Sequence, residues 1–238
     1  MEPGTCEVWW ASTAWSRPWH TDLLSDSERA RRTGLWEAGR AQYTVAAALL
    51  RLAAASHTAR AAEQVVVDRS CPRCGRYHGR PRLPGTGLYA SISHSGTTVA
   101  VALSCAGQVG VDVQQVEDDP VGELLPLVLA EPEIGHVAAA RDFFTYWVRK
   151  EALVKATGDG VTVPLPEVMV SPPGTPARLL GYPGRDGLAA QLNDLSPHAD
   201  AAAGAGAGAG YVGALAVLSP LPVVVHERSG ERLLTAQP

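Results

Sequence analysis

Residues 143–155 read FFTYWVRKEALVK, a stretch that combines a helical pattern with two charges on its apolar side. At about 100° per residue, Glu151 and Lys155 fall on the same arc as the large apolar side chains. Those apolar residues are Phe143, Phe144, Trp147, Val148 and Val154. We therefore predict a helix whose acid and ammonium face the protein interior, against the alternative of an i,i+4 pair on a solvated face.

Lysine is rare in this chain. Of its 20 basic residues only Lys150 and Lys155 are lysines, and they flank Glu151. Because every other basic residue is an arginine, the pair favours a site that needs a compact ammonium rather than a guanidinium fork. We place both lysines at a ligand-binding site.

The composition is that of a globular protein with a sizeable core, since 46% of the 238 residues are hydrophobic and 18% are charged. No run approaches the ~18 apolar residues of a membrane span, and residues 1–20 lack the basic start and apolar core of a signal peptide. Four cysteines do not make a disulfide-stapled secreted domain. We expect a cytoplasmic protein with reduced thiols and no membrane contact.

The charges are unevenly distributed. Residues 1–107 hold 12 arginines and 8 acidic residues, a net +4, whereas residues 108–238 have a net charge of −8. The basic half has no recognition-helix motif and no dense basic run, so it suits a small phosphorylated ligand better than a nucleic acid.

In the first half, Ser25 and Glu28 form a capping-box pattern. It predicts a helix over residues 26–37, a pause at Gly39 and a core helix over residues 40–55. Three arginines would lie along the segment that leads into this core helix: Arg29, Arg32 and Arg40. Each alone is typical of a solvated side chain, whereas the set has the charge to bind a phosphate.

The loop CPRCGRYHGRPRLPG follows a valine run at residues 65–67 that we predict to be a strand. Cys71, Cys74 and His78 have the spacing of half a zinc knuckle, but no second CxxC completes it. A zinc site and a turn stabilised by cysteine and glycine both fit this pattern.

Residues 89–104, YASISHSGTTVAVALS, predict two antiparallel strands joined at Ser95 and Gly96. His94 lies at this turn between Ser93 and Ser95. A turn histidine is usually only a polar surface residue, but here it is also placed to donate to a phosphate oxygen.

Residues 109–114, VGVDVQ, predict a strand whose three valines face one way. Asp112 and Gln114 project together on the other face. Beyond the central helix, short apolar runs predict a second antiparallel sheet, at residues 161–163, 168–170, 188–192, 211–218 and 223–225. The insert AAAGAGAGAG, residues 201–210, is expected to be a flexible linker.

Each half of the chain thus offers helices and antiparallel strands, so we predict an α+β protein of two subdomains, residues 1–106 and 107–238. Asp112, Gln114 and Glu151 supply oxygen ligands that suit Mg²⁺ bridged to a substrate phosphate, with Mn²⁺ as an alternative. Glu151, oriented by Lys155, would act as a general base.

These elements resemble the paired signature of 4'-phosphopantetheinyl transferases of the broad-specificity surfactin-synthetase type. GVDVQ at residues 110–114 precedes WVRKEALVK at 147–155, and SHS at 93–95 and GRP at 79–81 lie upstream. The resemblance runs from about residue 25 to 218, and the loop with the cysteines is similar to actinobacterial members.

The resemblance implies a pseudo-twofold fold of two similar subdomains, each an antiparallel sheet packed with helices, with coenzyme A in the cleft between them. Members transfer the 4'-phosphopantetheine arm to a serine of an apo acyl or peptidyl carrier protein and release 3',5'-ADP. The carriers serve fatty acid, polyketide or nonribosomal peptide synthesis. It implies a monomer with no nucleic-acid partner.

Carried over to this sequence, Asp112 and Glu151 are metal ligands, and Glu151 with Lys155 activates the acceptor serine. The residues implied to contact coenzyme A are Arg29, Arg32, Arg80, Ser93, His94, Lys150 and Lys155. Arg29 and Arg32 match the family's basic residues for the 3'-phosphate of coenzyme A less closely than the other residues match their motifs.

The chain departs from the family pattern at Gln114, where a second acid is usual. An amide there weakens direct Mg²⁺ binding and puts metal preference and rate in question. Two other readings stay open: a non-catalytic relative that binds coenzyme A or a carrier protein, and a zinc-dependent nucleic-acid module built on Cys71 and Cys74.

Overall fold

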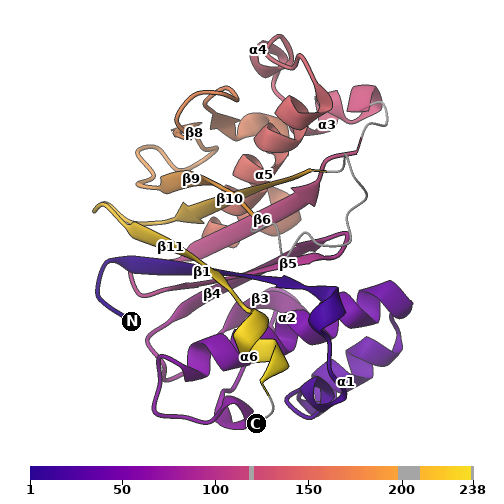
Figure 1. The fold of residues 1–238 in the computed structure, drawn as a ribbon. Helices are drawn as coiled ribbons and strands as arrows, with labels where there is room; N and C mark the ends of the chain where they lie inside the picture. The colour runs from indigo at the N-terminus through magenta and orange to yellow at the C-terminus, as the bar shows by residue number, and fades with distance from the viewer. Residues whose placement is uncertain (118–120, 198–209, 237–238) are drawn as a thin grey trace.

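The computed structural model describes residues 1–117, 121–197 and 210–236 as a mixed α+β protein (Figure 1). Its larger sheet has six strands. In order across the sheet they are β11 (Val224–Ser229), β1 (Thr5–Ser12), β5 (Thr98–Ser104), β4 (Tyr89–Ser95), β3 (Tyr77–Arg82) and β2 (Asp68–Ser70). The predicted hairpin of β4 and β5 is confirmed, and Gly96 takes a φ of 53° in its turn.

Helix α2 (Glu37–Ala55) covers one face of this sheet. Its alanines and leucines, including Leu49 and Leu50, pack on Val99, Val101 and Leu103 of β5 because they recur at the helical period. Helix α1 (Asp26–Thr33) precedes it, and the C-terminal helix α6 (Glu231–Thr235) packs beside it.

The second half of the chain builds a three-stranded sheet, β6 (Val109–Gln115), β10 (Tyr211–Val217) and β9 (Gln191–Leu195). Helix α5 (Ala140–Thr157) covers its outer face and ends at Gly158, whose φ of 78° closes the helix. The smaller elements here are α3 (Leu125–Val128), α4 (Glu131–Ile134) and the strand pair β7 (Met169–Val170) and β8 (Leu179–Gly181). Single 3-10 turns lie at Thr13–Trp15, Pro18–Thr21, Ala62–Gln64, Val121–Glu123, Gly160–Thr162 and Leu165–Glu167.

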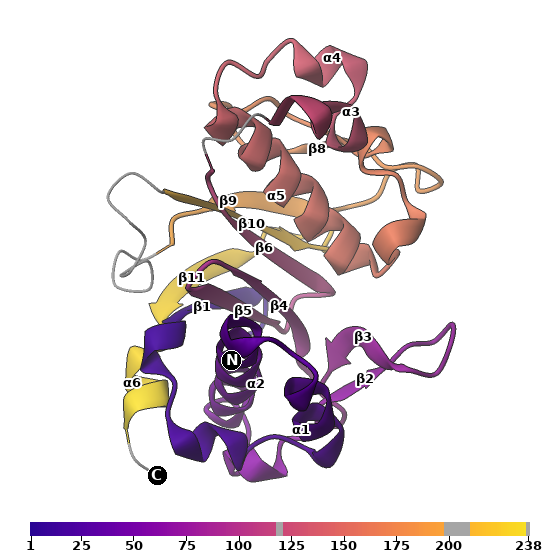
Figure 2. The ribbon, with the colours of Figure 1, turned by 90° about the vertical axis from the view of Figure 1, so that its right-hand side faces the viewer.

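The two sheets pack face to face, so that α2, the six-stranded sheet, the three-stranded sheet and α5 form four layers (Figure 2). The predicted valine face of β6 is confirmed, because Val109, Val111 and Val113 pack between the sheets. Three serines of β4 also join the layers by accepting hydrogen bonds from backbone N–H groups of β6. The pairs are Ser91 with Val111 (3.1 Å), Ser93 with Val113 (3.3 Å) and Ser95 with Gln115 (3.0 Å).

The capping box of Ser25 and Glu28 is confirmed, but the helix pause lies elsewhere. Helix α1 ends at Gly34, whose N–H bonds the carbonyl of Arg31. Gly39, where a pause was expected, lies inside α2. A Cβ there would lie 3.1 Å from the Trp36 indole nitrogen, so the glycine makes room for that ring.

Three expected strands differ from the structure. Residues 65–67 pair with no strand in the described chain, and Val65 and Val67 instead bury their side chains in the core around α2. Residues 161–163 fall on a 3-10 turn. The last strand, β11, runs parallel to β1 and completes the first sheet instead of the second.

The chain therefore returns at its end to the sheet of its first half. No helix among the described residues is long and apolar enough to span a bilayer. Apart from Gly210, the Ala/Gly insert lies outside the described residues.

Candidate active site

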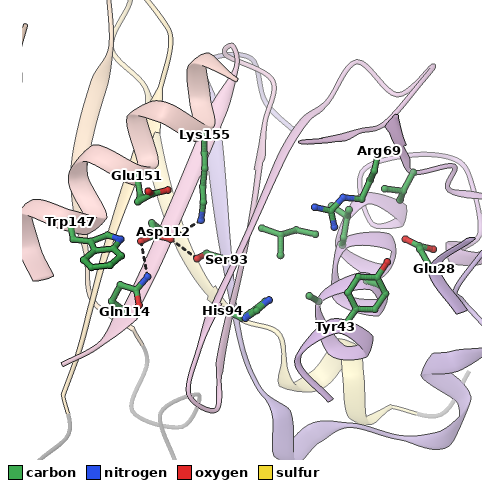
Figure 3. Close-up of a pocket in the computed structure, with 15 residues that line it drawn as sticks. Glu28, Tyr43, Arg69, Ser93, His94, Asp112, Gln114, Trp147, Glu151 and Lys155 are labelled. Carbon is green, nitrogen blue, oxygen red and sulfur yellow. Dashed lines mark hydrogen bonds and ion pairs between the residues drawn. The ribbon is translucent and has the colours of Figure 1, made fainter. Parts of the chain in front are cut away.

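The candidate site is built where α5 crosses β6 at close range. Gly110 makes this approach possible: a Cβ there would lie 2.0 Å from the Ala152 carbonyl oxygen and 2.5 Å from the Ala156 nitrogen. Because side chains of a strand alternate, Asp112 follows Gly110 on the same face and also points at α5. Glu151 and Lys155, one helical turn apart, lie over it (Figure 3).

Asp112 is the most connected of these side chains. It is 3% exposed, and its Oδ1 accepts hydrogen bonds from Ser93 Oγ and Lys155 Nζ, both at 2.6 Å. Lys155 Nζ also donates to the Val111 carbonyl at 3.0 Å. These partners offset the cost of burying a carboxylate and leave Oδ2 directed to the pocket side, where Gln114 lies.

Glu151 is half-buried and, among the described residues, receives no hydrogen bond from a protein donor. Burial raises the pKa of its carboxyl, the nearby negative charge of Asp112 raises it further, and Lys155 lowers it. A carboxylate with a raised pKa is a better proton acceptor near neutral pH. A bound cation would also reduce the repulsion between the Asp112 and Glu151 carboxylates.

Gln114 bridges the aspartate and the β4 turn. Its Nε2 lies 3.4 Å from Asp112 Oδ2, and its Oε1 accepts from Ser95 Oγ at 3.3 Å. The side chain is thus in reach of the pocket, as predicted, but its amide nitrogen faces the aspartate. To present Oε1 to a cation beside Asp112, the amide must rotate.

A pocket of about 390 Å³ opens beside these residues and reaches both halves of the chain (Figure 3). The later part of β4 borders the pocket with Ser93 and His94. One wall comes from β6 and α5 and the other from α2 and β2. The polar and aromatic lining residues are Glu28, Tyr43, Arg69, Ser93, His94, Asp112, Gln114, Trp147, Glu151 and Lys155.

His94 is exposed on the pocket wall. The surrounding protein atoms and the positive charge of Lys155 lower the pKa of its imidazole. The ring is therefore neutral near pH 7 and offers one N–H donor.

Two lining residues escaped the sequence analysis as ligand contacts. Arg69 donates its Nε to the Gly79 carbonyl at 3.0 Å, while its terminal nitrogens face the pocket and pair with no carboxylate in the described chain. Tyr43, expected in a core helix, has a buried hydroxyl without a hydrogen-bond partner among the described residues. Burial and the charge of Glu28 raise the pKa of Tyr43 to about 12, so this hydroxyl is a donor.

The available signal for Arg69 was its place two residues after the valine run of residues 65–67. Glu28 also lines the pocket, but its two oxygens pair with Arg51 at 2.6 and 3.2 Å, so its role is structural.

None of the four predicted arginines lines this pocket. Arg40 is exposed and donates to the carbonyls of Leu35 (2.7 Å) and Thr33 (3.2 Å). Arg29 is exposed and pairs with Asp26, and Arg32 Nε donates to Thr44 Oγ1 at 2.8 Å. Arg80 lies at the end of α5, where it donates to the Ala156 carbonyl at 3.3 Å.

Lys150 also lies away from the pocket. Its side chain is fully buried, and Nζ donates to Glu133 and to the carbonyls of Val128 (2.8 Å) and Leu165 (3.1 Å). Burial lowers the pKa of this lysine, and Glu133 opposes the shift. With all three donors engaged, Lys150 holds α3 and α4 against α5, so its predicted contact with coenzyme A is not supported by this placement.

Comparison with known proteins relates the same region to one family. Residues 108–204 match the sequence model of the 4'-phosphopantetheinyl transferase superfamily. The chain is similar to 4'-phosphopantetheinyl transferase AcpT of Salmonella typhi, with 36% identity over 88 residues that cover 34% of this chain and 46% of AcpT. It is also similar to 4'-phosphopantetheinyl transferase HetI of Nostoc sp., with 31% identity over 112 residues, 43% of this chain and 46% of HetI.

The matched parts thus span less than half the length of these relatives. Residues 108–204, which match the family model, include the strand and helix that carry Asp112, Glu151 and Lys155. Over residues 108–204 the chain is therefore similar to the 4'-phosphopantetheinyl transferase superfamily.

Proposed function

We propose that the protein transfers the 4'-phosphopantetheine arm of coenzyme A to a serine of an apo acyl or peptidyl carrier protein. The observation that carries the proposal is the pairing of two pocket carboxylates, Asp112 and Glu151, with Lys155 between β6 and α5. The family match over residues 108–204 supports it.

In the proposed reaction, the serine oxygen of the carrier attacks the phosphorus that bears the pantetheine arm. A new P–O bond forms as the bond to the bridging pyrophosphate oxygen breaks, and 3',5'-ADP leaves. Glu151 accepts the serine proton, which its raised pKa favours. Lys155, held by Asp112, keeps a positive charge beside the reacting oxygens.

The donor set fits a hard divalent cation. Asp112 and Glu151 both face the pocket, and no described protein donor satisfies Glu151. Burial and then repulsion from Asp112 raise the pKa of the Glu151 carboxyl. Carboxylate and amide oxygens are the ligands that Mg²⁺ and Mn²⁺ take. Asp112, Glu151 and a rotated Gln114 would hold such an ion, which neutralises pyrophosphate charge when bound.

The opposite wall suits the phosphates of coenzyme A. Arg69 and Tyr43 each present donors without a protein partner in the described chain, and His94 adds an N–H from β4. Unpaired buried donors are costly unless a ligand satisfies them. Ser93 already bonds Asp112, so its contribution to phosphate binding is indirect.

The fold supports a ligand between two similar units. In each, a long helix covers a largely antiparallel sheet: α2 on the first and α5 on the second. We propose that these units are the two pseudo-twofold subdomains that the resemblance implies, divided near residue 106, with β11 exchanged back to the first. We also propose that the protein acts as a monomer.

The direct test is to incubate the protein with coenzyme A, Mg²⁺ and apo carrier proteins from fatty acid, polyketide and nonribosomal peptide synthesis. Mass spectrometry should show a phosphopantetheine adduct on the carrier serine and stoichiometric release of 3',5'-ADP. Binding of coenzyme A with no adduct on any carrier would favour the alternative, a non-catalytic relative. The observation behind that alternative is Gln114, which stands where the family usually has an acid. Absence of both binding and transfer would refute the proposal.

Calorimetry tests the phosphate wall separately. Arg69→Ala and His94→Ala should weaken coenzyme A binding, and Arg17→Ala, an exposed arginine outside the pocket, should not. A variant that weakens coenzyme A more than dephospho-coenzyme A identifies a contact to the 3'-phosphate. The residues that only the resemblance assigns, tested in the same way, are Arg29, Arg32 and Arg80.

A further inference from the structure

The loop between β2 and β3, together with the start of β3, gathers three metal ligands outside the candidate active site. One ligand atom each of Cys71, Cys74 and His78 lies within 4.8 Å of the other two, and Cys74 Sγ is 2.9 Å from His78 Nε2. All three side chains are at least partly exposed. In the part of the chain that the structure describes, no other group of three His, Cys, Asp or Glu residues meets this distance.

The backbone of the turn is already arranged to present both sulfurs on one side. The N–H of Cys71 donates to the Arg76 carbonyl and the N–H of Gly75 to the Cys71 carbonyl, both at 2.8 Å. Gly75 has a φ of 69°, which a residue with a side chain rarely adopts.

The spacing fits a tetrahedral ion after small side-chain movements. With Zn–S near 2.3 Å and Zn–N near 2.0–2.1 Å, ligand atoms of a tetrahedral site lie about 3.5–3.8 Å apart. The separation is 2.9 Å between Cys74 Sγ and His78 Nε2 and at most 4.8 Å for the other two pairs, so the tetrahedral value lies within the observed bounds. Rotations of exposed side chains on the preformed turn are enough to equalise them.

We propose that Cys71, Cys74 and His78 bind one Zn²⁺ ion, with water in the fourth position. Two thiolates and one neutral imidazole balance the charge of the ion, and binding releases the two thiol protons to solvent. The ligands are soft, in contrast to the oxygen ligands of the candidate active site, so the two sites select different metals.

The ion would stiffen a segment of the first half whose arginines bond to the second half of the chain. Arg73, inside the CxxC turn, donates to Thr162 Oγ1 at 3.2 Å, just after α5. Two residues after His78, Arg80 donates to the Ala156 carbonyl at the end of α5. On the other strand, Arg69 is held by the carbonyl of Gly79. Closing the loop with a metal thus limits the movement of a pocket-lining arginine.

Cobalt is the probe for the test, because tetrahedral Co²⁺ bound by thiolate has strong charge-transfer and visible d–d absorption bands. The full chain, reduced with a phosphine and stripped of metal, is titrated with Co²⁺ and then with Zn²⁺. We expect bands that saturate at one equivalent and disappear as Zn²⁺ displaces the cobalt. Cys74→Ser should abolish the bands, and His78→Ala should weaken Co²⁺ binding at least tenfold and shift the d–d bands.

Cys105→Ser is the matched control, because it removes a partly exposed thiol outside the cluster and should leave the titration unchanged. Hydrogen exchange of the amides over residues 71–79 should slow with Zn²⁺ in the wild type and not in Cys74→Ser. Weak, octahedral-type absorption throughout the titration would overturn the proposal. So would bands that survive Cys74→Ser, or a Cys71–Cys74 disulfide that persists under reducing conditions. The readouts are independent of transferase activity, so this inference and the proposed function succeed or fail separately.

Discussion

Lys155 Nζ lies 2.6 Å from Asp112 Oδ1 and ties the last turns of α5 to the middle of β6. The same ammonium donates to the Val111 carbonyl, so it fixes the strand backbone as well as the carboxylate. This contact sets the position of Glu151, one helical turn before Lys155, over the pocket.

Replacing Glu151 by glutamine should remove the proton acceptor and keep the shape of the site. Because general-base catalysis contributes about 10²–10⁴-fold, we expect carrier modification to slow by at least ~10²-fold. Coenzyme A affinity and the unfolding midpoint should stay near the wild-type values. Single-turnover kinetics followed by mass spectrometry measure the rate.

Glu131→Gln, an exposed acid at the start of α4, is the control for loss of one negative charge. It should transfer at the wild-type rate. Near-normal turnover of Glu151→Gln would assign the proton acceptor to another group.

Gly110→Ala should disrupt the packing of α5 on β6. The new Cβ would lie 2.0 Å from a backbone oxygen, so the helix has to move away from the strand. Overpacking of this kind typically costs about 1–3 kcal/mol, and occasionally more. Urea denaturation should show this loss, together with reduced activity because Glu151 moves relative to Asp112.

The matched control is Gly135→Ala, whose φ is −64° and whose Cβ would meet nothing closer than 4.0 Å. It should be neutral or slightly stabilising. A stable, fully active Gly110→Ala protein would show that α5 and β6 are not in the contact described.

Replacing Lys150 by methionine should affect stability and leave the ligand site intact. The change leaves the buried Glu133 carboxylate without its cation, and breaking a buried pair in this way costs about 3–5 kcal/mol. Coenzyme A binding by the folded protein should be unchanged, because Lys150 does not line the pocket. Denaturation and calorimetry on the same variant separate the two effects.

The double variant Lys150→Met with Glu133→Gln should recover part of the lost stability, since no unpaired charge stays buried. A selective loss of coenzyme A affinity in Lys150→Met would instead restore the contact that the sequence analysis predicted.

Local patterns predicted the elements that carry the site. The alternation of residues 109–114 and the helical arc of Glu151 and Lys155 depend only on neighbouring residues, and both match β6 and α5. The arc argument also explains the outcome for Lys150. Lying next to Glu151 in sequence, it projects about 100° away around the helix, toward α4 rather than the pocket.

Long-range relationships were not accessible in this way. Residues 223–225 have the composition of a strand, but nothing local tells whether it joins β1 or the second sheet. The pocket wall shows the same limit. Arg29 and Arg69 are equally basic in the sequence, and only the packing of α1 and β2 exposes the first and turns the second to the pocket.

Glu7 should make the protein sensitive to acid. Its side chain is buried and is bound by His57 Nε2 (2.7 Å), Arg228 Nη2 (2.9 Å) and Trp9 Nε1 (3.1 Å). Burial by itself raises the pKa of Glu7, but the His57 hydrogen bond and the two positive partners more than offset it and lower the pKa below its ordinary value.

A carboxyl with a lowered pKa in the folded state adds stability above its unfolded pKa, and this stability is lost as the pH falls toward the folded pKa. Wild-type stability in urea should therefore fall below about pH 5, and Glu7→Gln should flatten this acid limb while lowering stability at neutral pH. Glu63→Gln, an exposed acid, should keep the wild-type profile. Identical acid limbs for wild type and Glu7→Gln would show that this carboxyl does not titrate with unfolding.

Gln114→Glu should strengthen Mg²⁺ binding by the free protein. In the structure the Gln114 amide faces Asp112 with its nitrogen, at 3.4 Å from Oδ2, and brings no charge. The wild-type site therefore has two carboxylates to balance a divalent ion, and we expect weak Mg²⁺ binding alone and tighter binding with coenzyme A, whose pyrophosphate adds charge. A third carboxylate should improve the Mg²⁺ affinity of the free protein at least about tenfold, or ~1.4 kcal/mol.

Gln108→Glu, which adds the same charge outside the pocket, should not change the Mg²⁺ affinity. Turnover need not rise in parallel, because the new charge also raises the pKa of Glu151 further. Calorimetric titration of Mg²⁺ into each protein, with and without coenzyme A, measures these affinities. Equal Mg²⁺ affinity in wild type and Gln114→Glu would place position 114 outside the metal site.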